Sequence, residues 1–245
     1  MRHILDPMAS VIRLYVDHPL VAGQSVPLTV EQSHYLFRVM RKGVGEKLEV
    51  FNGVDGEWSA EIIQAGRKSG ILLCRNISRP LVLPPDLWLM FAPLKKSRSN
   101  FIVEKATEMG ASQIMPIKTD FTNLERIRQD SLQSQAVEAA EQCGGTYVPS
   151  VLDLQKLSNV LDVWDDRKIM FCDETFAGNT VDLSHSPGPW AILIGPEGGF
   201  STAERKRLGE MSQVHRMALG PRILRAETAA IAALTLWQSN MGDWE

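Results

Sequence analysis

The sequence predicts an α/β protein in two parts, a small β-barrel over residues 1–80 and a larger domain with a mainly parallel sheet over residues 81–245. Up to about residue 80 the chain consists mostly of short β-rich runs separated by turn residues, whereas the later segments alternate between apolar strands and helices. Between these parts, Pro80, Pro84 and Pro85 indicate a stiff linker, because proline restricts its own φ and the conformation of its neighbour.

The first part is expected to form a barrel with one helical insertion. Asn52-Gly53 and Asp55-Gly56 are strong hairpin signals. Thr29 and Gln32 have the spacing of a capping box, which predicts a helix running to about Met40. The expected strands are Val11–Val16, Val26–Val30, Lys47–Phe51, Glu57–Ile63 and Gly70–Arg75.

The second part is expected to alternate strands with helices, which is typical of a parallel sheet. Its last predicted helix, Ala226–Met241, is apolar nearly all round, so we expect it to be buried in the core or in a subunit interface. The expected strands are Leu87–Leu94, Ile114–Ile117, Lys168–Cys172, Trp190–Ile194 and Val214–Leu219. The other expected helices are one that ends at Gly110, Leu132–Gln142 and Thr202–Met211.

The composition is that of a globular protein. With 245 residues, 44% hydrophobic and 22% charged, it excludes collagen-like, coiled-coil and disordered classes. Cys74, Cys143 and Cys172 lack CxxC spacing, so we expect neither disulfides nor a zinc knuckle, and we expect a cytoplasmic location. No apolar run approaches the roughly 18 residues that a membrane-spanning helix needs.

Charge is unevenly distributed along the chain. Residues 1–118 hold 15 Lys/Arg and 11 Asp/Glu, whereas residues 119–245 hold 11 and 18. This asymmetry favours an anion-binding face on the first half, and chance scatter of surface charge is the alternative.

A glycine-rich loop stands out between residues 191 and 204, AILIGPEGGFSTAE. A short apolar strand leads into Gly195–Gly199, and Ser201 with Glu204 then forms a capping box. Ligands of open α/β sheets bind at the carboxyl ends of strands, where this loop falls. Glu197 would repel a phosphate, so a neutral or cationic ligand fits better than a nucleoside triphosphate. An ordinary strand–helix turn is the alternative.

Two further groups of residues could carry chemistry. In LGPRILRAET (Leu219–Thr228), Arg222 and Arg225 precede a helix, where a positive charge opposes the helix dipole, so they serve another purpose or pair with a carboxylate such as Glu227. His34, Arg38, Arg41 and Lys42 have the spacing of one basic helical stripe. Lys95, Lys96 and Arg98 form a second basic cluster. Both clusters could contact phosphate groups, although a solvated charged face is the alternative.

The histidines His3, His18, His34, His185 and His215 show no metal-binding grouping, so no metal is expected. The sequence also lacks a GxSxG nucleophile elbow. A reaction that needs mainly positioning and a reactive cosubstrate is therefore favoured.

Five segments spread over nearly the whole chain form a recognisable set: HYLFRVMR (His34–Arg41), EKATEMGASQIMPI (Glu104–Ile117), EAAEQCG (Glu138–Gly144), IGPEGGFSTAE (Ile194–Glu204) and LGPRILRAETA (Leu219–Ala229). With these segments the chain resembles the RsmE family of 16S ribosomal RNA methyltransferases, in the SPOUT (α/β-knot) superfamily. One departure is Gly145, where the family usually carries arginine.

The resemblance implies a PUA-like RNA-binding barrel, a knotted domain with a deep trefoil knot, and a homodimer formed through the knot domain. It implies S-adenosylmethionine (SAM) as methyl donor and N3 of a uridine in 16S rRNA as acceptor, within the 30S subunit. The implied SAM-binding residues are Phe171, Cys172, Asp173, Glu174, Thr175, Ile194, Gly195, Pro196, Glu197, Gly198, Gly199, Met217, Leu219, Gly220, Ile223 and Leu224. The expected RNA-binding residues are Arg13, His34, Arg38, Arg41, Lys42, Lys95, Lys96 and Arg98.

For catalysis we expect Arg225 to stabilise the negative charge that develops on the uracil, and Glu197 to fix the loop or oppose the sulfonium charge. Two other functions stay open: a SPOUT methyltransferase acting on another RNA nucleotide, and a non-catalytic RNA-binding protein.

Overall fold

The structure is a computed structural model that describes residues 11–175 and 188–244. The chain divides into two compact units. The N-terminal unit comprises Met1–Val82 with Glu141–Tyr147, and the C-terminal unit comprises Leu83–Ala140 with Val148–Glu245. The predicted α/β class with a mainly parallel sheet is confirmed. Two of the five histidines that show no metal-binding grouping in the sequence, His3 and His185, lie outside the described residues.

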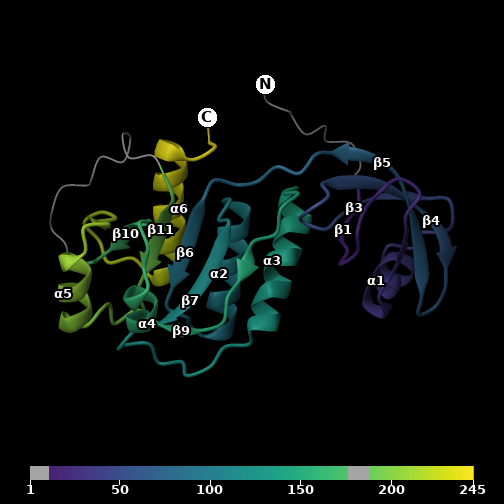
Figure 1. The fold of residues 1–245 in the computed structure, drawn as a ribbon. Helices are drawn as coiled ribbons and strands as arrows, with labels where there is room; N and C mark the ends of the chain where they lie inside the picture. Colours follow the sequence, from purple (N-terminus) through teal and green to yellow (C-terminus); the bar gives the residue numbers. More distant parts are fainter. Residues whose placement is uncertain (1–10, 176–187, 245) are drawn as a thin grey trace. The chain divides into compact units, whose positions relative to one another are not determined.

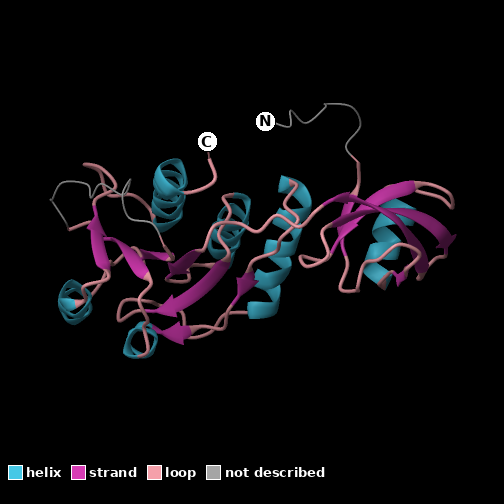
Figure 2. Cartoon of the chain, turned by 45° about the horizontal axis from the view of Figure 1, so that its top comes forward, coloured by secondary structure: helices cyan, strands magenta, loops and turns pink. Residues whose placement is uncertain are grey.

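The N-terminal unit is a curved five-stranded sheet that wraps around a short helical segment (Figure 2). Its strand order is β1-β3-β4-β5-β2, and every neighbouring pair is antiparallel except β1 and β3. The predicted hairpin joins β3 to β4. The strands are β1 (Arg13–Tyr15), β2 (Ser25–Pro27), β3 (Lys47–Phe51), β4 (Glu57–Ala65) and β5 (Gly70–Arg79).

The helical segment differs from its prediction after the first turn. Thr29 forms the predicted capping box with Gln32 and begins α1 (Val30–His34). The chain then continues as a π-helix, η1 (Tyr35–Val39), which breaks the 3.6-residue period. Arg41 has a φ of +55° and lies beyond the helix. The prediction that His34, Arg38, Arg41 and Lys42 form one helical stripe is therefore wrong.

The last residues of α3 complete the N-terminal unit. Arg13 donates to the backbone carbonyls of Glu141 and Gly145, each at 2.8 Å, and its Nε pairs with Glu57 at 2.6 Å. The Glu141 carboxylate accepts from the backbone N–H of Tyr15 at 2.7 Å. Gly145, which departs from the family pattern, thus contributes its carbonyl to a buried arginine.

The C-terminal unit is a parallel sheet covered by helices on both faces (Figure 1). Its main strand order is β12-β10-β11-β6-β7-β8, with β9 beside β7. The strands are β6 (Leu87–Phe91), β7 (Gln113–Lys118), β8 (Ser150–Val151), β9 (Gln155–Lys156), β10 (Lys168–Cys172), β11 (Trp190–Ile194) and β12 (Val214–Met217). The helices are α2 (Lys96–Glu108), α3 (Gln129–Cys143), α4 (Leu157–Asp162), α5 (Thr202–Glu210) and α6 (Ala226–Met241).

Alternate strand residues face two separate cores. Leu87 and Leu89 pack with apolar residues of α2, α3 and α6, whereas Met90 and Met115 pack with residues of α4 and α5. Burial of side chains on both faces explains why the central strands are continuous apolar runs. The predicted buried face of α3 (Leu132, Ala136, Ala139 and Ala140) and the predicted bounds of α6 are confirmed. None of the described helices is long and apolar enough to cross a membrane.

Candidate functional site

A cavity of about 130 Å³ lies where three adjacent parallel strands end. Its walls are the segments that follow β10, β11 and β12, together with the first turn of α6. Parallel strands bring their carboxyl ends to one edge of the sheet, so these segments meet although Asp173 after β10 and Ala218 after β12 are 45 positions apart in the sequence. The lining residues are Cys172, Asp173, Glu174, Ile194, Gly195, Pro196, Glu197, Met217, Ala218, Leu219, Gly220, Pro221, Arg222, Ile223, Leu224, Ala226 and Ala229.

Most of the predicted cofactor-binding residues line this cavity. Four do not: Phe171 is fully buried, and Thr175, Gly198 and Gly199 lie in the same loops outside the lining. Five lining residues were missed, namely Ala218, Pro221, Arg222, Ala226 and Ala229. Ala226 and Ala229 are three residues apart at the start of α6 and therefore lie on the same helix face. Two small side chains on one face, directly after the loop, are the sequence signal that could have predicted their place in the lining.

Close packing fixes the glycine-rich loop. A Cβ at Gly195 would lie 2.6 Å from the Phe200 ring, so a larger residue is excluded there. Gly199 has a φ of +68°, which favours glycine. Phe200 in turn packs edge-to-face on Phe171 with ring centroids 4.8 Å apart. The predicted capping box of Ser201 and Glu204 then begins α5.

Arg98 joins the loop that follows β11 to the first turn of α6. Its Nε donates to both carboxylate oxygens of Glu227, each at 3.0 Å, and its guanidinium also pairs with Glu197. The hydrogen bonds to Glu227 and Glu197 raise the pKa of Arg98, and the Arg98 hydrogen bond lowers the pKa of Glu227. Of the two roles predicted for Glu197, this ion pair favours fixing the loop.

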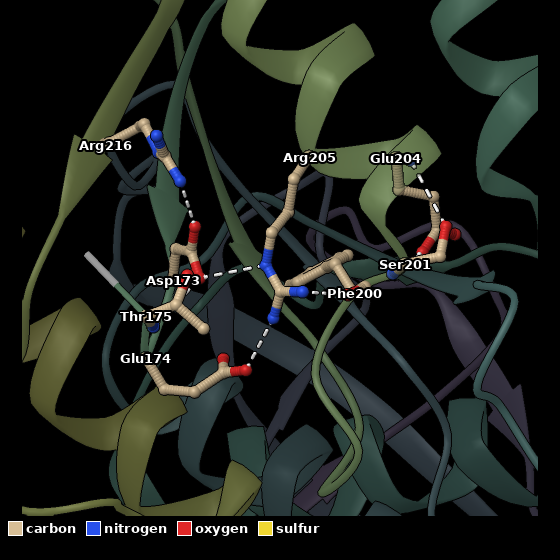
Figure 3. Close-up of polar contacts among 8 residues, drawn as sticks. All are labelled: Asp173, Glu174, Thr175, Phe200, Ser201, Glu204, Arg205 and Arg216. Atoms are coloured by element: carbon tan, nitrogen blue, oxygen red, sulfur yellow. Dashed lines mark hydrogen bonds and ion pairs between the residues drawn. The ribbon is translucent and has the colours of Figure 1, made fainter.

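Asp173 anchors the third wall, as Figure 3 shows. Its buried carboxylate accepts from Arg205 Nε at 3.3 Å and from the Thr175 hydroxyl at 2.8 Å, and it also pairs with Arg216 on β12. Arg205 extends from α5 and reaches Glu174 at 2.8 Å as well as the Phe200 carbonyl. Burial raises the pKa of Asp173, but the hydrogen bonds from Arg216 and Thr175 outweigh it and leave the pKa below its ordinary value.

Arg225 occupies the N-cap position of α6, and its side chain is exposed and makes no capping hydrogen bond. It lies outside the cavity lining, beside the lining residues Leu224 and Ala226. The Glu227 carboxylate, which the sequence suggested as a partner for Arg225, accepts hydrogen bonds from Arg98. Arg225 still acts on Glu227 electrostatically, because its charge lowers the pKa of that carboxyl.

The predicted RNA-binding residues fall in both units. In the N-terminal unit His34, Arg38 and Arg41 are exposed, and Lys42 pairs with Glu46 at 2.9 Å. The Arg13 side chain is only 13% exposed and makes the internal contacts described above, and its contact with RNA stays a prediction. In the C-terminal unit Lys95 and Lys96 are exposed, whereas Arg98 is engaged by two carboxylates.

Two protein-family models match this chain. The family model described as an RNA methyltransferase domain matches residues 82–238, and the model described as an RNA methyltransferase PUA domain matches residues 28–73. The chain therefore belongs to this family of RNA methyltransferases, and the resemblance to its RsmE members is confirmed.

Individual relatives and solved structures support the same family assignment. The chain is 28% identical to the ribosomal RNA small subunit methyltransferase E of Buchnera aphidicola, over 94% of this chain and 97% of the relative. The solved structure of a Neisseria gonorrhoeae ribosomal RNA small subunit methyltransferase E bound to SAM matches with a TM-score of 0.88 at 25% identity, covering 96% of this chain and 100% of that one. A Legionella pneumophila protein solved with SAM matches with a TM-score of 0.88 at 28% identity and the same coverage.

Proposed function

We propose that this chain transfers a methyl group from SAM to N3 of a uridine in the 16S rRNA of the small ribosomal subunit. The observation that carries the proposal is the cavity at the carboxyl ends of β10, β11 and β12, which is lined by twelve of the sixteen residues that the resemblance implied. Relatives with the same fold are solved with SAM bound, which supports SAM as the ligand of this cavity.

The residues of the cavity fit SAM chemically. Leu219 and Leu224 offer apolar contacts for an adenine ring, and the carboxylates of Glu174 and Glu197 in the lining are each paired with an arginine, so the wall carries little net charge of its own. Ile223 is 86% exposed beside the cavity, so a ligand there would cover an apolar side chain. When bound, SAM supplies a methyl group that its sulfonium charge has already activated.

The protein then has to align donor and acceptor. Holding the uracil N3 in line with the methyl group removes translational entropy, worth up to roughly 7–11 kcal/mol for ideal alignment. Arg98, Arg205 and Asp173 hold the cavity walls in place before the RNA binds. Arg225 stabilises the negative charge on the uracil as N3 loses its proton.

The acceptor base must be unpaired, because N3 is part of the pairing edge and is inaccessible in a duplex. We propose that the N-terminal unit holds the surrounding RNA through His34, Arg38 and Arg41, and that the assembled 30S subunit in the cytoplasm is the substrate. A homodimer formed through the knotted domain completes the proposal. The trefoil knot itself stays a prediction.

A modification map of 16S rRNA tests this function. We expect mass spectrometry of rRNA from a strain lacking the gene to show one N3-methyluridine missing, and purified protein with SAM to restore it. Loss of a methyl group from another nucleotide, such as a tRNA 2′-hydroxyl, would overturn the N3-uridine assignment. Unchanged rRNA together with no calorimetric heat from SAM would instead indicate a non-catalytic RNA-binding protein.

A further inference from the structure

A second cavity lies at the carboxyl ends of β6 and β7. It has a volume of about 200 Å³ and lies between the first turn of α2 and the segment that joins β7 to α3. Since a water molecule takes roughly 30 Å³ in the liquid, the cavity has room for several waters or one flat heteroaromatic ring. The methyl-donor cavity lies at the ends of β10, β11 and β12, so the two cavities occupy different strands of the same sheet edge.

The walls of this second cavity are largely aliphatic. Leu94 and Leu132 are buried, and Leu124 and Ile127 are half-buried. Apolar walls with a few polar groups are typical of pockets that take a small planar ligand. Bases taken out of a stack bind between aromatic or apolar side chains of this kind.

One polar group in the wall lacks its hydrogen bond. The Oδ1 atom of Asn100 is buried and has no hydrogen-bond partner among the described residues, whereas its Nδ2 donates to Gln135 Oε1 at 3.3 Å. A buried acceptor without a donor destabilises the fold unless a water molecule or a ligand supplies the donor. Nucleobases carry N–H groups at their pairing edges, and these are donors of the required kind.

Two cations stand at the rim. Lys96 and Arg126 are exposed, and within the described ranges neither takes part in an ion pair. Arg128 beside them is paired with Asp130 at 3.2 Å. Unpaired cations next to an apolar cavity suit a ligand with a flat apolar part and a phosphate, which is the chemistry of a nucleotide.

We propose that this cavity binds one unpaired nucleotide of the RNA substrate, next to the methyl acceptor in the RNA. Its base enters between the aliphatic side chains and donates to Asn100 Oδ1, and its phosphate contacts Lys96 and Arg126. This inference rests on the proposed function, because it takes RNA as the substrate. The cavity thereby helps to select which uridine reaches the methyl donor.

Two variants test the cavity by different means. Asn100→Leu removes the acceptor, and Ser131→Leu fills the cavity from α3, where Ser131 lines it. The substrate is small ribosomal subunits from a strain lacking the modification. We expect each variant to raise the KM for subunits by about 5- to 150-fold, the range of effects when the contacts that read one base are lost. The SAM Kd should stay unchanged, and so should the melting temperature of Asn100→Leu, because the variant removes the unsatisfied buried Oδ1 together with the 3.3 Å hydrogen bond to Gln135.

The double variant Lys96→Ala/Arg126→Ala tests the rim, and Lys206→Ala is its control, an exposed lysine on α5 whose Nζ lies 3.9 Å from the Glu210 carboxylate. We expect the double variant to raise KM and to weaken its dependence on salt, and the control to do neither. Unchanged KM in Asn100→Leu and Ser131→Leu would overturn the inference, and so would a change in oligomeric state, which would indicate a protein partner. If the wild-type protein transfers no methyl group to subunits, the proposed function fails instead, and that result is separately visible.

Discussion

Arg98 and Glu227 form a forked ion pair across 129 residues of sequence, with Nε of the arginine 3.0 Å from both carboxylate oxygens. The same guanidinium holds Glu197 in the glycine-rich loop. One side chain from α2 therefore ties the loop that follows β11 to the first turn of α6. Both segments contribute residues to the wall of the cavity in which we place SAM.

Replacing Arg98 should therefore weaken SAM binding. Arg98→Gln releases Glu197 and Glu227 and leaves the glycine-rich loop and the start of α6 to be ordered by the ligand, so we expect the SAM Kd from calorimetry to rise on the order of tenfold. Lys105→Gln is the matched control, because it removes ion pairs with Glu104 and Glu108 on the same helix. If the variant kept its SAM affinity and bound RNA more weakly, the result would contradict this account and support the RNA-binding role that the sequence predicts for Arg98.

Arg225 should affect turnover far more than SAM binding. Its exposed guanidinium at the start of α6 is assigned to the charge on the uracil, so Arg225→Ala should lower kcat by about 100- to 1000-fold. Single-turnover methyl transfer measures this effect, and calorimetry measures the SAM Kd, which should be unchanged. Equal losses in turnover and in SAM binding would refute the catalytic role.

Glu57 should make the stability of the N-terminal unit depend on pH. Burial raises its pKa, but the hydrogen bonds from Arg79 and Arg13 outweigh burial and hold the pKa below the ordinary 4.5. A lowered carboxyl pKa contributes stability above pH 4.5 that is lost as the pH falls through the folded-state pKa.

Glu57→Gln should accordingly lower the unfolding free energy by about 2 kcal/mol at pH 7, and the difference from wild type should shrink below pH 4.5. Urea unfolding at several pH values measures both effects. Glu61→Gln is the control, because its partner Arg75 is exposed and the pair contributes about 1 kcal/mol or less. A difference for Glu57→Gln that is the same at pH 3 and pH 7 would contradict this account.

The three cysteines should differ sharply in reactivity. Cys143 is exposed, Cys74 and Cys172 are buried, and burial raises the pKa of Cys172 to about 12. Since the thiolate is the reactive form, a thiol reagent at pH 8 should modify one thiol in the folded protein and three after unfolding. Cys143→Ser should leave no rapidly reacting thiol, and rapid modification of Cys172 in this variant would be inconsistent with the structure.

Local patterns predicted most of the elements. The capping boxes at Thr29 and Ser201 and the apolar face of α3 depend on residues a few positions apart, and they form as predicted. The elements that were missed, β8, β9 and α4, have two to six residues each, too few to show a period. The π-helix was missed because its residues also fit an α-helical pattern, and the different period shows only in the backbone.

The site was predictable only in part, for a related reason. The loops after β11 and β12 carry motifs that can be recognised locally, and they line the cavity. Arg98 looked like one more basic residue of a surface cluster, because both of its partners lie about a hundred or more positions away. The internal contacts of Arg13 were hidden for the same reason, since its acceptors at Glu141 and Gly145 belong to a distant segment. The sequence alone does not show which basic side chains already have hydrogen-bond or ion-pair partners inside the fold.

A crystal structure of the protein soaked with SAM or with its demethylated product tests the central claim most directly. We predict electron density for the ligand between Gly195–Glu197 and Met217–Leu224, with Arg98 still bridging Glu197 and Glu227. Density for the ligand anywhere else on the molecule, with that cavity empty, would contradict the account.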